Sequence, residues 1–196
     1  MQETNQDNSQ RDDLRQAVEV LRRGGIIIYP TDTVWGIGCD ARNSEAVKRI
    51  YKVKQRADNK AMITLVSDLT MLERTVCGIP DVAYSIIEYS EKPTTIVYDK
   101  GINVAPELIG SDGTLGVRVT RDTFSAELCR RLGAPIVSTS ANISGYPTPQ
   151  NFTEIDPTVL DAADYVCLWR REDYSKAKPS SVMRLGEDGT FVIIRQ

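Results

Sequence analysis

Apolar residues recur at helical spacing near the start of the chain. They are Leu14, Ala17, Val18 and Leu21. This spacing predicts an amphipathic helix, and the Gly24-Gly25 pair supplies its end. A continuous apolar run over residues 26–29 follows and stops at Pro30. Such a run is typical of a buried strand that delivers its end to a loop.

Helical and strand patterns then alternate as far as the C-terminus. A second amphipathic helix is predicted around residues 46–51, with Ser44 as its N-cap. Further helices are predicted near residues 69–74, 82–89 and 122–132. Strands are predicted at residues 62–66, 94–98, 115–119 and 135–138. The chain closes with a predicted hairpin, whose strands over residues 181–185 and 190–194 flank a Gly-Glu-Asp-Gly turn.

This order of elements indicates a single α/β domain. Two strands follow each other directly at the end, so we expect a twisted mixed sheet with flanking helices rather than a purely parallel one. A length of 196 residues suits one compact domain. Residues 1–11 are polar, and we expect a disordered N-terminus there, followed by the folded domain over residues 12–196.

Composition narrows the class of protein. Apolar residues make up 41% of the chain, which is enough for a core. The 24 Lys and Arg residues nearly balance the 27 Asp and Glu residues, and the formal net charge is −3. This balance argues against non-specific coating of nucleic acid but allows a local basic site. The sequence has neither the roughly 18 consecutive apolar residues of a membrane helix nor a signal peptide, so we expect no membrane partner.

Cysteine and histidine content limits the chemistry. The four cysteines are far apart and form no C-x-x-C pair, so we interpret them as small apolar fillers that a cytoplasmic chain keeps reduced. They are Cys39, Cys77, Cys129 and Cys167. The chain contains no histidine, which excludes Ser–His, Cys–His and His–metal mechanisms. Catalysis therefore has to use carboxylates, hydroxyls, lysine, arginine, backbone amides or a hard cation held by oxygen.

Three polar segments each follow an apolar strand or helix, and ligands gather at strand ends in open α/β sheets. Residues 30–41 carry threonines, Asp32 and two glycines, which suit either a ligand loop or an ordinary turn. Residues 54–60 hold three cations at the end of a helix, which suit either a solvated helix terminus or a phosphate clamp. Residues 138–145 hold four hydroxyls and an amide, a density that favours ligand binding.

Taken in order, these segments resemble the signature of the YrdC-type threonylcarbamoyl-AMP synthases. That family carries a Pro-Thr-Asp-Thr-Val-Tyr-Gly-Leu-Gly-like loop, a Lys-x-Arg element followed by a Lys, and a Ser-x-Asn loop. The matching parts of this chain are Pro30 to Gly38, Lys54-x-Arg56 with Lys60, and Ser140-x-Asn142. Residues 113–119, residues 179–182 and Arg195 resemble further family segments, so the resemblance covers nearly the whole chain from about residue 14 onward.

The resemblance implies a YrdC/RibB-like fold and a catalytic domain over residues 12–196. It implies a nucleotidyltransferase reaction, in which threonine and bicarbonate form N-carboxy-threonine. The carboxylate of this intermediate attacks the α-phosphate of ATP and releases pyrophosphate, with Mg²⁺ bound to the ATP. An attacking carboxylate needs no general base at neutral pH, so a histidine-free site suits this reaction. The L-threonylcarbamoyladenylate then serves tRNA modification through partner proteins, and the implied contact of this chain with tRNA is weak.

The resemblance also implies the site residues. Lys54 and Arg56 are expected to be catalytic. ATP is expected to contact Arg56, Lys60, Thr114, Ser140, Asn142 and Arg195. Threonine is expected to contact Thr33, Arg118, Ser138 and Ser180, with Arg118 as the forked partner of its carboxylate. Asp32 is not assigned, because it suits either the orientation of a loop or a metal, and no residue is expected as a direct metal ligand.

Several positions depart from the family pattern and leave the contacts near them open, and the stretch over residues 92–95 is one of them. Trp35 replaces the usual tyrosine, Ala57 and Ala61 replace prolines, and Leu65 replaces a histidine of many members. None of these changes removes a charge from the cationic segment.

Two other functions stay open at this point. One is a YrdC-like domain that forms a carbamoyl-adenylate from carbamoyl phosphate, although such domains usually sit in longer chains with zinc-finger-like segments. The other is an RNA-binding module without catalysis, whose binding would fall steeply with salt.

Overall fold

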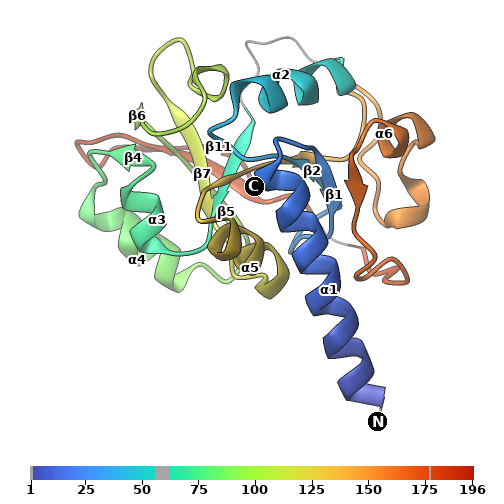
Figure 1. Cartoon of the computed structure of the whole chain (residues 1–196). Helices are drawn as coiled ribbons and strands as arrows, with labels where there is room; N and C mark the ends of the chain where they lie inside the picture. The colour runs from blue at the N-terminus through green and yellow to red at the C-terminus, as the bar shows by residue number, and fades with distance from the viewer. Residues whose placement is uncertain (1, 56–61, 177) are drawn as a thin grey trace.

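The computed structural model describes residues 2–55, 62–176 and 178–196, with side chains from residue 8 onward (Figure 1). The α-helices are α1 (Gln2–Arg22), α2 (Ser44–Val53), α3 (Leu69–Glu73), α4 (Asp81–Tyr89), α5 (Thr123–Leu132) and α6 (Pro157–Asp161). Two short 3₁₀ helices are η1 (Pro106–Leu108) and η2 (Phe152–Glu154). The strands are β1 (Ile27–Tyr29), β2 (Gly36–Gly38), β3 (Ile63–Val66), β4 (Val76–Cys77), β5 (Thr94–Tyr98), β6 (Lys100–Gly101), β7 (Leu115–Val119), β8 (Ile136–Ser140), β9 (Tyr165–Val166), β10 (Ser181–Leu185) and β11 (Phe191–Arg195).

The described strands form one large mixed sheet and one small ribbon. The large sheet has nine strands in the order β11-β10-β5-β7-β3-β8-β2-β1-β9, and β4 pairs with β6 in the ribbon. The pairs β10–β5, β3–β7 and β1–β9 are parallel, whereas the other neighbours are antiparallel. The expected single α/β domain with a mixed sheet and flanking helices is confirmed.

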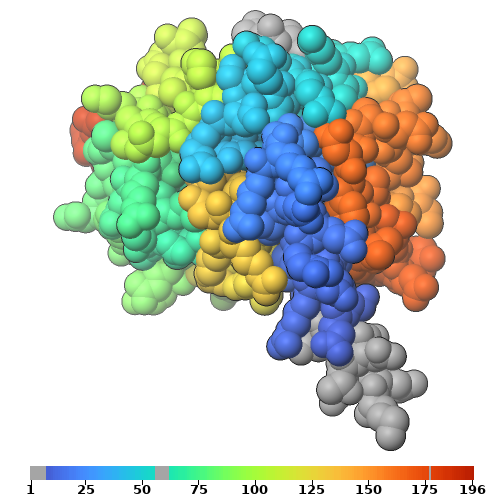
Figure 2. All heavy atoms as spheres, viewed as in Figure 1, coloured from blue at the N-terminus to red at the C-terminus, as the bar shows by residue number. Residues whose placement is uncertain are grey.

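Helices cover both faces of the sheet, and each face has its own apolar core. Along β1, Ile27 and Tyr29 point into one core while Ile28 points into the other, as the two-residue period of a strand requires. The first core contains residues of α1 and α5, and the second contains residues of α2, α3, α4 and α6. In the space-filling view, α1 lies on the surface between α5 and the segment that carries β9 (Figure 2).

Most predicted elements lie where the apolar pattern placed them. The strands over residues 94–98, 115–119 and 181–185 are confirmed with these bounds. The helix predicted from Asp122 is α5, and the Asp122 carboxylate caps it by accepting the backbone N–H of Ser125 at 2.8 Å. The closing hairpin is β10 and β11.

The N-cap of α2 differs from the prediction. Asn43 is the cap, because its Oδ1 accepts the backbone N–H of Ala46 at 3.0 Å. The Ser44 hydroxyl instead donates to Glu107 Oε1 at 2.6 Å and so ties the start of α2 to η1. Both asparagine and serine are good cap residues, so only the backbone conformation at Asn43 distinguishes them.

The N-terminus also differs from the prediction. We expected a disordered segment over residues 1–11, but α1 begins at Gln2 and its first part projects away from the domain (Figure 1). Glutamine, glutamate and arginine are good helix formers, so the polar segment can extend a helix that packing holds further along. From residue 8 onward, Asp13 is the first buried residue of α1, and its carboxylate accepts the backbone N–H groups of Leu168 and Trp169. The domain boundary at residue 12 stays a prediction.

Candidate active site

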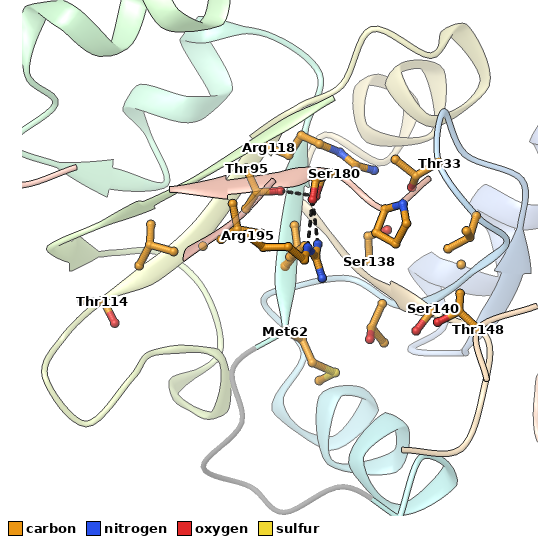
Figure 3. Close-up of a pocket in the computed structure, with 18 residues that line it drawn as sticks. Thr33, Met62, Thr95, Thr114, Arg118, Ser138, Ser140, Thr148, Ser180 and Arg195 are labelled. Carbon is orange, nitrogen blue, oxygen red and sulfur yellow. Dashed lines mark hydrogen bonds between the residues drawn. The ribbon is translucent and has the colours of Figure 1, made fainter. Parts of the chain in front are cut away.

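A pocket of about 360 Å³ lies over one face of the central strands. Thr95 on β5, Gly116 and Arg118 on β7, and Ser138 and Ser140 on β8 line it (Figure 3). We expected a site at the strand ends, but these positions place it largely on the sheet face. Elsewhere this face of the sheet is covered by α1 and α5. The residues of β5 and β7 that alternate with the pocket residues point into the core on the opposite face.

The residue types along β7 explain why this face is open. Leu115 and Val117 point into the core, whereas Gly116 and Arg118 alternate with them and face the pocket. A Cβ atom at Gly116 would lie 3.7 Å from Thr95 Cγ2, at ordinary contact distance. The glycine is therefore not needed for strand packing, and its missing side chain leaves room on the floor of the pocket.

The pocket brings together predicted site residues from distant parts of the chain. The predicted residues that line it are Thr33, Thr114, Arg118, Ser138, Ser140, Ser180 and Arg195. They come from the loop after β1, from β7 and its preceding turn, from β8, from the start of β10 and from the end of β11. The structure thus places the four residues expected for threonine and three of those expected for ATP around one cavity.

Arg118 supplies a buried positive charge to this pocket. Its side chain is 4% exposed, and its Nη2 forms an ion pair with Asp32 Oδ1 at 3.0 Å. Its Nε is buried and has no hydrogen-bond partner among the described residues. A buried donor without a partner is costly, so this edge of the guanidinium favours an incoming anion. Burial raises the pKa of the Asp32 carboxyl, while the charge of Arg118 opposes that rise.

The last strand fixes a second arginine at the pocket. Arg195 donates from Nε and Nη2 to the carbonyl oxygen of Ser180, at 3.1 and 2.8 Å (Figure 3). The Ser180 hydroxyl lies 2.9 Å from the Thr95 hydroxyl, so Ser180 joins β10, β11 and β5 at this point. These contacts orient Arg195 from behind and leave its remaining N–H groups near the pocket.

Lys54 lies elsewhere than we predicted. It is 2% exposed and is not among the residues that line the pocket. Its Nζ donates to the carbonyl oxygens of Ser140 and Asn142, at 2.5 and 2.7 Å. A lysine at the end of α2 therefore holds the polar loop after β8, because its long side chain reaches across to two backbone acceptors. The predicted direct contact with phosphate does not match this placement.

Asn142 also differs from the expected direct contact. Its Nδ2 donates to the carbonyl oxygen of Tyr146 at 2.7 Å, and the residue does not line the pocket. The amide therefore closes a turn over residues 142–146. The predicted phosphate residues Arg56 and Lys60, like Ala57 and Ala61, lie outside the described residues.

Two departures from the family pattern lie away from the pocket. Trp35 is 5% exposed and its ring packs against Phe152, with ring centroids 5.0 Å apart. The guanidinium of Arg171 lies over the other ring, 4.6 Å from the Phe152 centroid. Leu65 is fully buried in the core beside α5. Neither residue lines the pocket, so their side chains complete the core and not the site.

Sequence reasoning missed several residues that line the pocket. They include Met62, Thr95, Thr139 and Thr148. The alternation of polar Thr95 with buried Ile96 inside a predicted strand was a usable signal, because polar strand positions face away from the apolar core. Thr148 lies in a segment without periodicity, so nothing local to it indicated its position.

The described part of the chain has neither a cluster of metal-ligating side chains nor a helix that could span a membrane. Its Cys, Asp and Glu residues form no group of three or more that could hold a metal ion. No helix over residues 2–55, 62–176 or 178–196 has both the length and the apolar character to cross a membrane.

Comparison with known proteins identifies the family. A model of the Sua5/YciO/YrdC family, described as telomere recombination, matches residues 19–196. The chain belongs to this family. The threonylcarbamoyl-AMP synthase of Stenotrophomonas maltophilia is 38% identical over 154 residues, which cover 77% of this chain and 83% of that protein. The protein of the same name from Nitrosococcus oceani is 35% identical over 154 residues, covering 78% and 83%. These relatives confirm the resemblance and the expectation of an enzyme.

Solved structures of the Sua5/YciO/YrdC family confirm the fold. E. coli YciO matches with a TM-score of 0.81 and 29% identity over 95% of this chain and 89% of its own. P. abyssi Sua5 complexed with L-threonine matches with a TM-score of 0.77 and 26% identity over 88% of this chain. The match covers 50% of that Sua5 chain, so this chain spans about half its length.

Proposed function

We propose that this chain makes L-threonylcarbamoyladenylate and pyrophosphate from ATP, L-threonine and bicarbonate. The observation that carries the proposal is the buried guanidinium of Arg118, whose Nε has no partner among the described residues, in a pocket lined by hydroxyls. The names of the curated relatives and the L-threonine complex of Sua5 support the same substrate.

The adenylation step needs alignment and charge neutralisation rather than proton transfer. Bicarbonate and the threonine amine condense to N-carboxy-threonine with loss of water. One oxygen of the new carboxylate then attacks the α-phosphorus of ATP, and the bond to the β-phosphate oxygen breaks to release pyrophosphate. A carboxylate is ionised at neutral pH, so the attack requires no histidine. Hydrogen-bond donors and cations held near the phosphates stabilise the negative charge that develops in the transition state and so accelerate the reaction.

The pocket residues divide between the two substrates in this proposal. Arg118 binds the threonine carboxylate, and hydroxyls of Thr33, Ser138 and Ser180 orient the amino acid. Thr114, Ser140 and Arg195 contact the nucleotide, and Arg56 and Lys60 bind the triphosphate. Lys54 and Asn142 act by shaping the loop that carries Ser140.

Mg²⁺ is proposed to arrive with ATP. When bound, it neutralises charge on the phosphate oxygens. Oxygen ligands from phosphate and water suit Mg²⁺.

The adenylate is a mixed anhydride, so it must pass to an acceptor before water hydrolyses it. We propose that partner proteins transfer its threonylcarbamoyl group to an adenosine of tRNA in the cytoplasm. In this arrangement the chain itself makes only a weak contact with tRNA.

The reaction is tested with labelled bicarbonate, ATP, Mg²⁺ and a panel of amino acids. A labelled adenylate that forms only with threonine supports the proposal. Product formation that needs carbamoyl phosphate instead shows the carbamoyl-adenylate activity. If no adenylate forms, tRNA binds equally well with and without ATP and threonine, and this binding falls steeply with salt, the chain is an RNA-binding module.

Replacement of Arg118 by alanine tests the substrate assignment within the pocket. We expect Arg118→Ala to raise the KM for threonine by more than about tenfold and to change the KM for ATP by less than about twofold. Arg184→Ala is the control, because Arg184 is also ion-paired, with Asp99 at 3.0 Å, but does not line the pocket. An unchanged threonine KM in Arg118→Ala rules out this assignment.

A further inference from the structure

The loop after β1 places a carboxylate directly against the arginine of the pocket. We propose that Asp32 is a positioning residue, which holds the Arg118 guanidinium in place to receive the carboxylate of the amino-acid substrate. This inference rests on the proposed function, because it concerns the same site and the same substrate.

The Asp32 side chain contacts the Arg118 side chain from a position outside the main pocket. Asp32 Oδ1 lies 3.0 Å from Arg118 Nη2, and the two side chains are 19% and 4% exposed. Arg118 lines the main pocket, whereas Asp32 lines a separate cavity of about 270 Å³ together with Lys92, Thr94 and other residues. The ion pair therefore lies between the two cavities, with the arginine toward the substrate and the carboxylate behind it.

The loop that carries Asp32 is itself held firmly. The carbonyl oxygen of Thr31 accepts Arg170 Nη1 at 3.1 Å, and the Thr31 hydroxyl donates to the carbonyl oxygen of Val34 at 2.8 Å. The backbone N–H of Thr33 donates to the same hydroxyl at 3.0 Å. The residues on both sides of Asp32 are thus fixed by hydrogen bonds. A carboxylate on such a loop can fix a neighbouring guanidinium in turn.

The buried charge of Arg118 explains why a neighbouring carboxylate is useful here. A guanidinium stays protonated even when buried, so it needs a counter-charge to remain in the interior. Asp32 supplies that charge as an ion pair at Nη2, while both Asp32 Oδ1 and Arg118 Nε lack a hydrogen-bond partner among the described residues. The pair therefore keeps a donor free for a second carboxylate and spares the long arginine side chain from ordering upon binding.

Other roles for Asp32 predict different contacts. A metal ligand would need further oxygen donors, yet the described residues form no group of three metal-ligating side chains. A residue acting directly on the reacting atoms would have to face the main pocket, and Asp32 is not among the residues that line it. The contact that the structure does show is with Arg118.

The test compares Asp32→Asn with wild type by steady-state kinetics and by calorimetry of L-threonine binding. The asparagine has nearly the same shape but no charge, so we expect the KM and the dissociation constant for threonine to rise about tenfold. The KM for ATP should change by less than about twofold, and kcat should fall less than the threonine affinity. Asp32→Glu, which keeps the charge, should recover part of the affinity.

Asp40→Asn is the matched control. Asp40 has a side chain 13% exposed and an ion pair with Arg42 at 2.8 Å, but it does not line the pocket. We expect its threonine affinity to equal that of wild type. If Asp32→Asn and Asp40→Asn weaken threonine and ATP equally, the role is merely structural and the proposal fails.

A double-mutant cycle with Arg118→Lys decides whether Asp32 acts through Arg118. If it does, adding Asp32→Asn to Arg118→Lys should weaken threonine by much less than the tenfold seen in wild type. Fully additive effects, or an unchanged threonine affinity in Asp32→Asn, overturn the proposal. If the wild-type chain binds threonine but forms no adenylate, the proposed reaction is refuted. The double-mutant cycle measured by calorimetry still decides the role of Asp32 in that case.

Discussion

At the residue scale, the site separates cations that look alike in the sequence. Arg118 and Lys54 are both almost fully buried, at 3% and 2% exposure. Arg118 lines the pocket and has a buried Nε without a hydrogen-bond partner among the described residues, whereas the Lys54 amine donates to two backbone carbonyl groups. A buried cation thus serves the ligand only where its hydrogen-bonding capacity is not already used by the protein.

Lys54→Met is predicted to destabilise the fold as well as the site. The substitution removes the donor to the carbonyl groups of Ser140 and Asn142 and leaves both without that partner. We expect the free energy of unfolding to fall by about 2–6 kcal/mol, since each of the two acceptors that loses its partner costs about 1–3 kcal/mol. Urea denaturation measures this loss. Reduced activity with an unchanged free energy of unfolding would instead support a direct contact of Lys54 with phosphate.

At the element scale, glycines let β2 lie between β1 and β8. The segment that we interpreted as a loop contains this three-residue strand, which pairs antiparallel with both neighbours. A Cβ atom at Gly38 would lie only 2.2 Å from the carbonyl oxygen of Val137 and 3.0 Å from Tyr29 Cε1. The glycine is therefore required for the close approach of the strands, and β2 in turn places Gly36 beside the pocket.

Gly38→Ala is predicted to lower stability through this contact. The backbone oxygen of Val137 cannot move away without disturbing the pairing of β8, so we expect a loss of about 1–3 kcal/mol in the free energy of unfolding. Gly116→Ala is the matched control in a strand, because its added Cβ would lie 3.7 Å from Thr95. Equal unfolding free energies for both variants in urea would contradict the argument.

At the scale of the whole molecule, the two cores on either side of the sheet keep most cysteine thiols away from solvent. Cys39, Cys129 and Cys167 are buried, and Cys77 is partly buried at the edge of the small ribbon. Burial raises the pKa of the Cys129 thiol to about 12, and it also raises the pKa values of Cys39 and Cys167. This agrees with their interpretation as small apolar fillers.

Thiol titration of the native protein is predicted to detect one reactive cysteine. A raised pKa leaves almost no thiolate at pH 8, and the thiolate is the reactive form, so the three buried cysteines should not react. We expect a chromogenic disulfide reagent to label Cys77 alone, and Cys77→Ser to abolish the fast reaction. Unfolding in guanidinium chloride should expose all four thiols. Rapid reaction of a second thiol in the native protein would contradict the burial of the core.

The C-terminal strand shows another whole-molecule property. β11 forms one edge of the large sheet, and all five of its residues are exposed. The hairpin was predicted from its turn and its apolar runs. The exposure of its residues depends on which strands pair in the sheet, and the local sequence does not indicate that pairing. The same strand carries Arg195 to the pocket.

The amino-acid sequence is enough to predict the alternation of helices and strands, the mixed α/β class, a chemistry without histidine and seven of the residues that line the pocket. Hydrophobic period and turn residues act locally, so they can be read directly from neighbouring positions. Motifs such as residues 30–38 and Ser140-x-Asn142 identified the site segments for the same reason.

Which of these residues face the pocket depends on how the chain packs in three dimensions. The tertiary structure places Lys54 behind the Ser140 loop, Trp35 and Leu65 in the cores, and Asp32 against Arg118. The physical reason is that burial and hydrogen-bond partners depend on residues far apart in sequence. Asp32 and Arg118 meet because β1 and β7 belong to one sheet, and their spacing along the chain carries no record of that meeting.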